Sequence, residues 1–259
     1  MSFVVQTELQ KVVYVKLHRP EVRNAFNSEM IAELTEIFRK LEKRRDLYAI
    51  VLLGEGKVFC AGADLTWMKA MVNYSFEENR QDAFRLFEMF EAMSALTLPL
   101  LGVVQGAVFG GGLGLISTCD YVIAEEGTQF CFSEVKLGIA PAVISSFILP
   151  KVNPGIIRPL MLSGRVFDPA LAMAAGLVHE IVPAGEGHNA IQRVLHSFRE
   201  CGVNAVRSHK ALLRDLPRLS WSEQKERTAN VISELRIGSE GQEGLRAFLE
   251  KRDPKWREV

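Results

Sequence analysis

Residues 104–115 (VQGAVFGGGLGL) place five glycines within twelve positions, directly after the apolar run LLGV at residues 100–103. Because glycine loses more backbone entropy on folding than other residues, such a stretch is expected where the backbone needs unusual dihedral angles or approaches another group closely. Its spacing fits the dinucleotide pattern G-x-G-x-x-G poorly, and no Lys-Ser or Lys-Thr pair follows as in a P-loop. Two interpretations stay open: close packing of a helix on a strand, and backbone N–H groups that bind a ligand oxygen.

A helix that begins near Gly111 turns its first, unpaired N–H groups and their partial positive charge toward such a ligand. The loop CAGADL at residues 60–65 also follows an apolar strand and leads into a helix, so Ala63 is a second candidate donor. Two such donors stabilise negative charge that develops on a carbonyl oxygen, as in an oxyanion hole. The side chain of Asp64 is better explained as the N-cap of a helix over residues 65–71.

The hydrophobic periodicity of the chain predicts an α/β fold. Apolar and β-branched runs predict strands over residues 11–18, 49–53, 100–104 and 178–182. Apolar residues at helical spacing predict a helix capped by Ser28, a second over residues 75–96 and, beyond Pro141, helices over residues 169–175, 190–200, 205–213 and 220–237. We therefore expect a sheet-rich N-terminal part and a helical C-terminal part whose apolar faces pack against another subunit.

Composition narrows the class of protein. The chain has 259 residues, 31 Lys and Arg against 31 Asp and Glu, and a formal net charge of zero, which disfavours nucleic acid as a partner. Its four cysteines, Cys60, Cys119, Cys131 and Cys201, are far apart and form no C-x-x-C pair, so we expect reduced thiols and no metal site. The N-terminal sequence predicts no signal peptide, and no apolar run reaches membrane-spanning length. These features favour a cytoplasmic protein that does not enter a membrane.

Six segments together resemble the crotonase, or enoyl-CoA hydratase/isomerase, superfamily: HRPEVRNAFN (18–27), FCAGADL (59–65), QGAVFGGGLGLISTCDYVIA (105–124), FSEVKLGIAP (132–141), LSGRVFDPALAMAAGLVHEIVP (162–183) and EGLRAFLEKRDPKW (243–256). The resemblance implies a crotonase-like ββα superhelix over residues 1–200 that holds the acyl-CoA site. It also implies a helical trimerisation region over residues 201–259, and a homotrimer or a homohexamer built as a dimer of trimers. The substrate is then an acyl-CoA thioester, with no cofactor beyond its coenzyme A and no metal.

The resemblance also implies roles for single residues. The thioester oxygen is expected between the N–H groups of Ala63 and Gly111, and Glu134 is expected to be the catalytic acid and base. The substrate is expected to contact Arg23, Ala25, Phe26, Ala61, Asp64, Leu65, Trp67, Gly110, Gly114 and Pro141, together with Phe248 and Lys251 from a neighbouring subunit.

The chain departs from the family pattern at one position. Enoyl-CoA hydratases of this family use two glutamates, the first three residues after the oxyanion glycine, where this chain has Gly114. Glu134 matches the second; the alternative interpretation is a structural carboxylate that pairs with a nearby basic residue, and the family position favours the catalytic role. If it lies in an apolar pocket, its pKa should be raised. Glu77, Glu78 and Asp82 are candidates for a replacement carboxylate. Ala142 stands where dienoyl-CoA isomerases and chlorobenzoyl-CoA dehalogenases carry an aspartate.

Three segments, GADLTWMK (62–69), FGGGLGL (109–115) and SEVKLGIAPAVIS (133–145), look like bacterial methylglutaconyl-CoA and carboxygeranoyl-CoA hydratases. The leading hypothesis is therefore a hydratase of a 3-branched 2-enoyl-CoA, such as 3-methylglutaconyl-CoA of leucine degradation. Lys69, Lys136 and Ser145 are candidates to bind its distal carboxylate, and Trp67 with Met68 could line the acyl pocket or belong to the core. Two alternatives stay open: a Δ3,Δ2-enoyl-CoA isomerase that uses one glutamate, and a degenerate CoA-ester-binding protein without catalysis.

Overall fold

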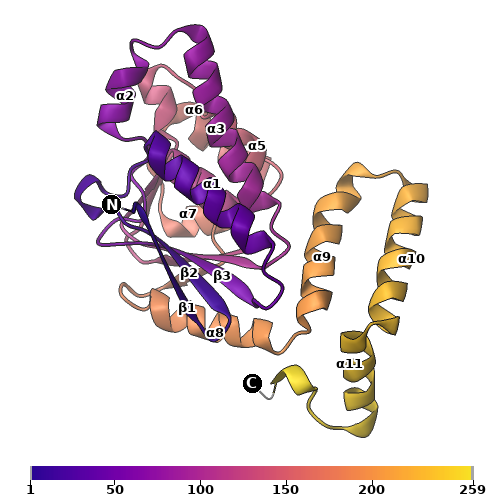
Figure 1. The fold of residues 1–259 in the computed structure, drawn as a ribbon. Coiled ribbons are helices and arrows are strands. Elements are labelled where there is room, and N and C mark those ends of the chain that lie inside the picture. The colour runs from indigo at the N-terminus through magenta and orange to yellow at the C-terminus, as the bar shows by residue number, and fades with distance from the viewer. Residues whose placement is uncertain (1, 258–259) are drawn as a thin grey trace.

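The computed structural model describes residues 2–257 and shows strands and helices in alternation, followed by a helical arm (Figure 1). The strands are β1 (Val4–Leu9), β2 (Val12–Leu17), β3 (Ala49–Gly54), β4 (Leu100–Val104), β5 (Ala107–Phe109), β6 (Tyr121–Glu125), β7 (Gln129–Cys131) and β8 (Glu180–Val182). The helices are α1 (Ser28–Glu42), α2 (Leu65–Met71), α3 (Phe76–Ser94), α4 (Gly111–Ser117), α5 (Ala142–Ile148), α6 (Pro154–Ser163), α7 (Pro169–Ala174), α8 (Gly187–Arg199), α9 (Val203–Asp215), α10 (Trp221–Ile237) and α11 (Ser239–Glu250). Four 3₁₀ turns complete them: η1 (Pro20–Val22), η2 (Ser133–Leu137), η3 (Leu216–Arg218) and η4 (Lys255–Arg257).

The strands form two sheets. The larger sheet has the order β1-β2-β3-β4-β6-β8, in which β1 is antiparallel to β2 and the remaining pairs are parallel. The smaller sheet pairs β5 with β7 in parallel, and Cys60 bridges to Val108 at its edge. The chain passes three times from a strand of the large sheet, through the small sheet or its edge, into a helical segment. The three passages are β3, Cys60 and α2; β4, β5 and α4; and β6, β7 and η2.

The pleat of β2 divides the core into two layers. Val13, Val15 and Leu17 belong to a large hydrophobic cluster that includes residues of α1 and α3, whereas Val12 and Tyr14 face a smaller cluster with residues of α8. This follows from the alternation of side chains along a strand that is buried on both faces. Figure 1 shows α1 and α3 side by side on one face of the sheet, and α8 beneath the other.

The last helices, α9, α10 and α11, stand beside the sheet and its helices as an arm (Figure 1). Arg207 of α9 is buried and ties the arm to the core through a 3.0 Å hydrogen bond from its guanidinium to the Thr97 hydroxyl. The arm carries apolar side chains that are largely exposed in the single chain, among them Trp221, Ile237 and Leu249, at 86%, 80% and 78%.

The predicted α/β fold is confirmed, and several boundaries need correction. Ser28 is not the cap of α1: the Asn27 side chain accepts the hydrogen bond from the Met30 N–H at 2.9 Å, and Ser28 is the first helical residue. The helix predicted over residues 75–96 ends at Ser94, with Ser75 as its cap, and the strand predicted to start at residue 178 starts at Glu180. Strands β1, β5, β6 and β7 and helices α5, α6 and α11 were not predicted as separate elements, although α11 lies in the C-terminal region that was expected to be helical.

Over the described residues 2–257, no helix is long and apolar enough to cross a membrane. Within the same residues, no cluster of three or more His, Cys, Asp or Glu side chains is arranged to hold a metal ion. Cys60, Cys119 and Cys131 are buried free thiols, and Cys201 is an exposed one.

Candidate active site

The N–H of Ala63 is directed by its neighbours. Phe26 forms a parallel bridge with Ala63, in which the Phe26 N–H donates to the Gly62 carbonyl at 2.7 Å and the Asp64 N–H donates to the Phe26 carbonyl at 2.7 Å. Because a trans peptide is planar with its C=O and N–H on opposite sides, a Gly62 carbonyl that faces Phe26 turns the Ala63 N–H away from it. Ala63 is exposed, and its N–H has no backbone acceptor within residues 2–257. This donor is free to bind a ligand.

Gly111 is the first residue of α4, so its N–H lies in the helical turn that has no intrahelical acceptors. A Cβ on Gly111 would lie 2.6 Å from Cε2 of the Phe26 ring, closer than atoms can approach. Packing therefore requires glycine here, against the ring of a loop residue rather than against a strand of the sheets. Phe26 thus contacts both candidate donors, Ala63 through its backbone and Gly111 through its ring.

Gly110 makes room for a carboxylate. Its φ of +49° and ψ of −118° are angles that residues with a Cβ rarely adopt. A Cβ at this position would lie 3.2 Å from Oε1 of Glu134. The glycine next to the α4 N-terminus therefore lets the Glu134 carboxyl approach the loop backbone.

Glu134 lies in η2 and is half-buried. Its Oε2 is buried without a hydrogen-bond partner in the described part of the chain. Burial raises the pKa of Glu134 above its ordinary value of 4.5 and outweighs the opposing effect of its own backbone N–H. The expected rise in pKa is confirmed in direction, and no ion pair to Glu134 occurs among the described residues, contrary to the structural interpretation of this carboxylate.

The space beside Gly114, where the first glutamate of the family pattern would project, is filled by apolar side chains. A Cβ on Gly114 would lie 2.5 Å from Cζ of Phe90 and 2.6 Å from Cγ2 of Ile144. Gly114 is therefore needed for the packing of α4 against α3 and α5. A carboxylate at this position has no room.

The candidate replacement carboxylates differ in their surroundings. Glu77 and Glu78 are exposed, and Glu78 completes the capping box of α3 with Ser75. Asp82 is buried, and burial raises its pKa above 3.8 although Arg85 lowers it. The indole N–H of Trp67 also lowers the Asp82 pKa, yet Nε1 has no partner with hydrogen-bond geometry within residues 2–257. Trp67 is part of the large hydrophobic cluster.

The side chains proposed to bind a distal carboxylate do not gather at one place. The Ser145 hydroxyl donates to the Pro141 carbonyl at 2.6 Å, as expected within a helix turn. Lys136 extends toward Gly164: a Cβ added to that glycine would lie 3.2 Å from the Lys136 Cε. Lys69 is exposed on α2. The described structure gives no support for a shared role of these three residues.

The other predicted binding residues fall into three groups. Arg23, Ala25 and Ala61 lie on the two paired loops, where the Ala61 N–H donates to the Arg23 carbonyl at 3.0 Å. Leu65 lies beside these loops and is 75% exposed. Pro141 is buried and directly precedes α5. The Asp64 side chain caps α2, as predicted, by accepting from the Thr66 N–H at 2.7 Å. Phe248 lies on α11 and Lys251 ends it, in the arm across the molecule from α2, so this chain does not bring them to its own site (Figure 1).

Two residues of this region were missed by the sequence reasoning. Arg19 forms an ion pair with Asp64 at 2.8 Å, and its side chain is only 11% exposed. Asn24 is fully buried with a φ of +53°, and its side-chain amide donates to the carbonyls of Glu55 and Val58 at 2.9 and 2.8 Å. Both stand in the quoted segment HRPEVRNAFN, whose polar residues beside an apolar strand were the available signal.

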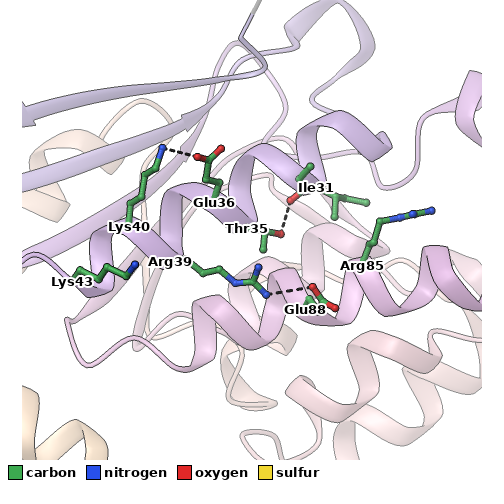
Figure 2. A pocket seen from close by; sticks show the side chains of 9 residues that line it. Ile31, Thr35, Glu36, Arg39, Lys40, Lys43, Arg85 and Glu88 are labelled. Atoms are coloured by element: carbon green, nitrogen blue, oxygen red, sulfur yellow. Dashed lines mark hydrogen bonds and ion pairs between the residues drawn. The ribbon is translucent and has the colours of Figure 1, made fainter.

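A groove of about 430 Å³ lies elsewhere, between α1 and α3 (Figure 2). Four of its charged side chains form two ion pairs: Lys40 with Glu36 at 2.6 Å on α1, and Arg39 with Glu88 at 3.3 Å between the helices. Because these ion pairs are exposed, and none of the residues predicted for the site lines the groove, we interpret it as a solvated helix surface rather than part of the site.

The chain is similar to known enoyl-CoA hydratases along almost its whole length. The enoyl-CoA hydratase/isomerase family matches residues 7–259. The enoyl-CoA hydratase ACTT6 of Alternaria alternata is 31% identical over 250 residues, which cover 95% of this chain and 82% of that protein. Among solved structures, AtuE of Pseudomonas aeruginosa is 32% identical with a TM-score of 0.96, over 99% of this chain and 100% of that chain. An enoyl-CoA hydratase from Shewanella pealeana is 34% identical with a TM-score of 0.93, over 98% and 96%.

The sequence match and the fold match agree, since both extend from the first strands through the C-terminal helices. The shared span includes the two loops with free N–H groups and the turn that carries Glu134. The protein is an enzyme that belongs to the enoyl-CoA hydratase/isomerase family.

Proposed function

We propose that the protein is an enoyl-CoA hydratase that adds water reversibly across the double bond of a 2-enoyl-CoA. The observation that carries this proposal is Glu134: a half-buried carboxyl with a raised pKa and an unpartnered oxygen, beside the glycine turn that starts α4. A carboxyl whose pKa approaches the working pH can act both as general base and as general acid.

The reaction needs only this carboxyl and two N–H donors. Glu134 as carboxylate takes a proton from water while the water oxygen bonds to C3 of the substrate. The electron pair of the C2–C3 double bond moves toward the thioester, whose oxygen then carries negative charge and accepts hydrogen bonds from the Ala63 and Gly111 N–H groups. Glu134 next gives its proton to C2, so one water has been added and the carboxylate is restored.

Coenzyme A would be held by the paired loops, with Arg23, Ala25 and Ala61 nearest to its nucleotide and pantetheine. The arm is proposed to form a trimer, or two stacked trimers, in which Phe248 and Lys251 reach the nucleotide of a neighbouring subunit. The adjoining exposed side chains of Phe248 and Leu249 on α11, at 81% and 78%, support this because contiguous exposed apolar surface marks an interaction site. We propose no cofactor besides the coenzyme A of the substrate, and action in the cytoplasm.

For the acyl group we propose a 3-branched chain, with 3-methylglutaconyl-CoA of leucine breakdown as the first candidate. The support is the resemblance of GADLTWMK (62–69) and SEVKLGIAPAVIS (133–145) to hydratases of such substrates, which also carry glycine at the Gly114 position.

A second function, Δ3,Δ2-enoyl-CoA isomerisation, is favoured by the packing at Gly114. Phe90 and Ile144 fill the space of a second carboxylate, which in two-glutamate hydratases helps to hold the attacking water. A single carboxyl that removes a proton from C2 and returns it to C4 suffices for isomerisation, and no water takes part.

Turnover of 3-methylglutaconyl-CoA, crotonyl-CoA and a 3-enoyl-CoA by wild type and Glu134→Gln distinguishes these functions. We expect hydration, fastest with the branched ester, and its loss in the variant. Isomerisation without hydration would replace the proposal by the second function. Tight binding of CoA esters without turnover would indicate a binding protein, and hydration that survives in Glu134→Gln would place the chemistry on another residue.

A further inference from the structure

We propose that Arg19 is a positioning residue that fixes the direction of the Ala63 N–H through its ion pair with Asp64. This inference rests on the proposed function, in which the Ala63 N–H binds the thioester oxygen. Arg19 itself does not touch the substrate in this scheme; it acts through the loop that carries the donor.

Arg19 joins the two loops of the site with one guanidinium. Nη2 donates to Oδ2 of Asp64 at 2.8 Å, and Nη1 donates to the Ala25 carbonyl at 2.6 Å. The ring of Phe3 lies 5.1 Å from the Arg19 Cζ, within the range of a cation–π contact. A planar guanidinium with fixed N–H directions holds two acceptors in one relative geometry, which a lysine ammonium does not do.

Asp64 transmits this restraint to Ala63. Its Oδ1 accepts from the Thr66 and Trp67 N–H groups at 2.7 and 3.3 Å, while its Oδ2 receives Arg19. Burial alone would raise the pKa of Asp64, but Arg19 and the two N–H groups together lower it by more. The pKa therefore lies below the ordinary value of 3.8, and the side chain is ionised at neutral pH. The carboxylate that follows Ala63 directly is thus fixed from both sides.

The same loops are joined by the backbone bridge between Phe26 and Ala63, so Arg19 acts in parallel with it. The Arg19 N–H also donates to Oδ1 of Asn24 at 2.9 Å, which keeps the 19–26 turn closed. Because a buried ion pair often adds little net stability after its desolvation cost, the geometry that it imposes is the more direct explanation of its presence at this loop.

The test uses a conjugated chromophoric enoyl-CoA, 4-(dimethylamino)cinnamoyl-CoA. Its absorption moves to longer wavelength when its thioester carbonyl accepts hydrogen bonds. We expect a red shift on wild type, most of it lost in Asp64→Asn and Arg19→Met, and partial recovery in Arg19→Lys. For crotonyl-CoA, kcat should fall by about 10- to 100-fold with a smaller change in KM, since a misplacement of about 1 Å costs rate on this scale.

Two variants separate positioning from folding. Asp64→Asn keeps a side-chain oxygen at the N-cap, where Asn is as effective as Asp, so the helix start should persist. Lys210→Met removes a partly buried ion pair with Asp120, 2.5 Å long, that joins α9 to the core. We expect Lys210→Met to lower the melting temperature but to keep the full red shift and kcat.

The outcomes are distinct. A wild type without any red shift would overturn the proposed donor site and this inference with it. A normal wild-type shift that persists in folded Asp64→Asn and Arg19→Met would overturn the role of Arg19 alone. A loss of shift in Lys210→Met as large as in Arg19→Met would mean that general destabilisation, rather than the direction of the Ala63 N–H, is measured.

Discussion

Glu134 is the residue on which the proposed chemistry depends, and its burial has a consequence for the pH dependence of activity. Because burial raises its pKa above 4.5, the carboxylate needed as a base is lost at a higher pH than for an exposed glutamate. We expect the acidic limb of kcat/KM for crotonyl-CoA to have its midpoint above 4.5. Binding of butyryl-CoA over the same pH range is the control, and an acidic limb that follows this binding would assign the limb to substrate affinity instead.

The same raised pKa predicts an effect on stability. A carboxyl whose pKa is higher in the folded than in the unfolded chain stabilises the fold at low pH, and this contribution is lost as pH rises through the folded pKa. Glu134→Gln, which stays neutral, should therefore have a higher free energy of unfolding than wild type at pH 7 to 8. The difference should shrink toward pH 4. Urea unfolding at both pH values measures it, and equal stability at pH 8 would contradict the burial of this carboxyl.

Gly114 gives a third prediction at the scale of single residues. Gly114→Ala puts a Cβ 2.5 Å from the Phe90 ring, and overpacking of this kind costs about 1–3 kcal/mol. Phe90→Leu should relieve part of that cost, so the double variant should show a favourable coupling energy of about 0.5 kcal/mol or more. Urea unfolding of the four proteins gives the cycle. Simple additivity would show that the contact between Gly114 and Phe90 is not the constraint.

Individual residues of the site were predictable to different degrees. Glu134 and the proposed donors Ala63 and Gly111 could be named because they stand in the segments that resemble the family, and their roles stay predictions. The apolar filling beside Gly114 could not be foreseen, because Phe90 and Ile144 come from helices whose packing no local pattern fixes. Arg19 was missed for the same reason: an ion pair across 45 residues of chain leaves no periodic signal.

At the scale of elements, the start of α1 tests how well capping can be predicted. Asn27 and Ser28 are both good N-cap residues, and only the observed Asn27 dihedrals, φ −131° and ψ 173°, decide between them. Asn27→Ala should lower the free energy of unfolding by about 1 kcal/mol. Ser28→Ala, at the first helical position, should stay within about 0.5 kcal/mol of wild type. Thermal or urea unfolding measures both, and a larger cost at Ser28 would reverse the correction.

Three of the missed strands have a plain physical cause. β1 has one buried residue, Val4, and five exposed ones, because it lies at the edge of the sheet, so its apolar alternation is weak. β5 and β7 have three residues each, too short for any period to appear. The central strands β2, β3 and β4 are buried on both faces and are rich in Val, Ile and Leu, and these were predicted almost to the residue.

For the whole molecule, the arm predicts self-association. Largely exposed Trp221, Ile237 and Leu249 on α10 and α11 leave apolar surface that a soluble single chain would not be expected to present. Sedimentation equilibrium should give three or six times the chain mass of 28.9 kDa. Lys251→Ala should then weaken CoA-ester binding without changing the mass. A monomer at micromolar concentration would remove the proposed contribution of Phe248 and Lys251 from a neighbour.

Phe26 has a wider consequence, because its backbone pairs with Ala63 while its ring rests on Gly111. The loop proposed to hold coenzyme A thus contacts both proposed donors to the thioester oxygen through one residue. Binding energy from the coenzyme A part of the substrate can then align the two N–H donors. Contacts far from the reacting carbons would in this way raise kcat rather than tighten substrate binding. The crotonyl thioester of N-acetylcysteamine lacks the nucleotide and most of the pantetheine. It should then be turned over with a lower kcat, as well as bound more weakly, than crotonyl-CoA. Phe26→Leu removes the contact of the ring with Gly111. In this variant the kcat values for the full-length and the shortened thioester should become more alike.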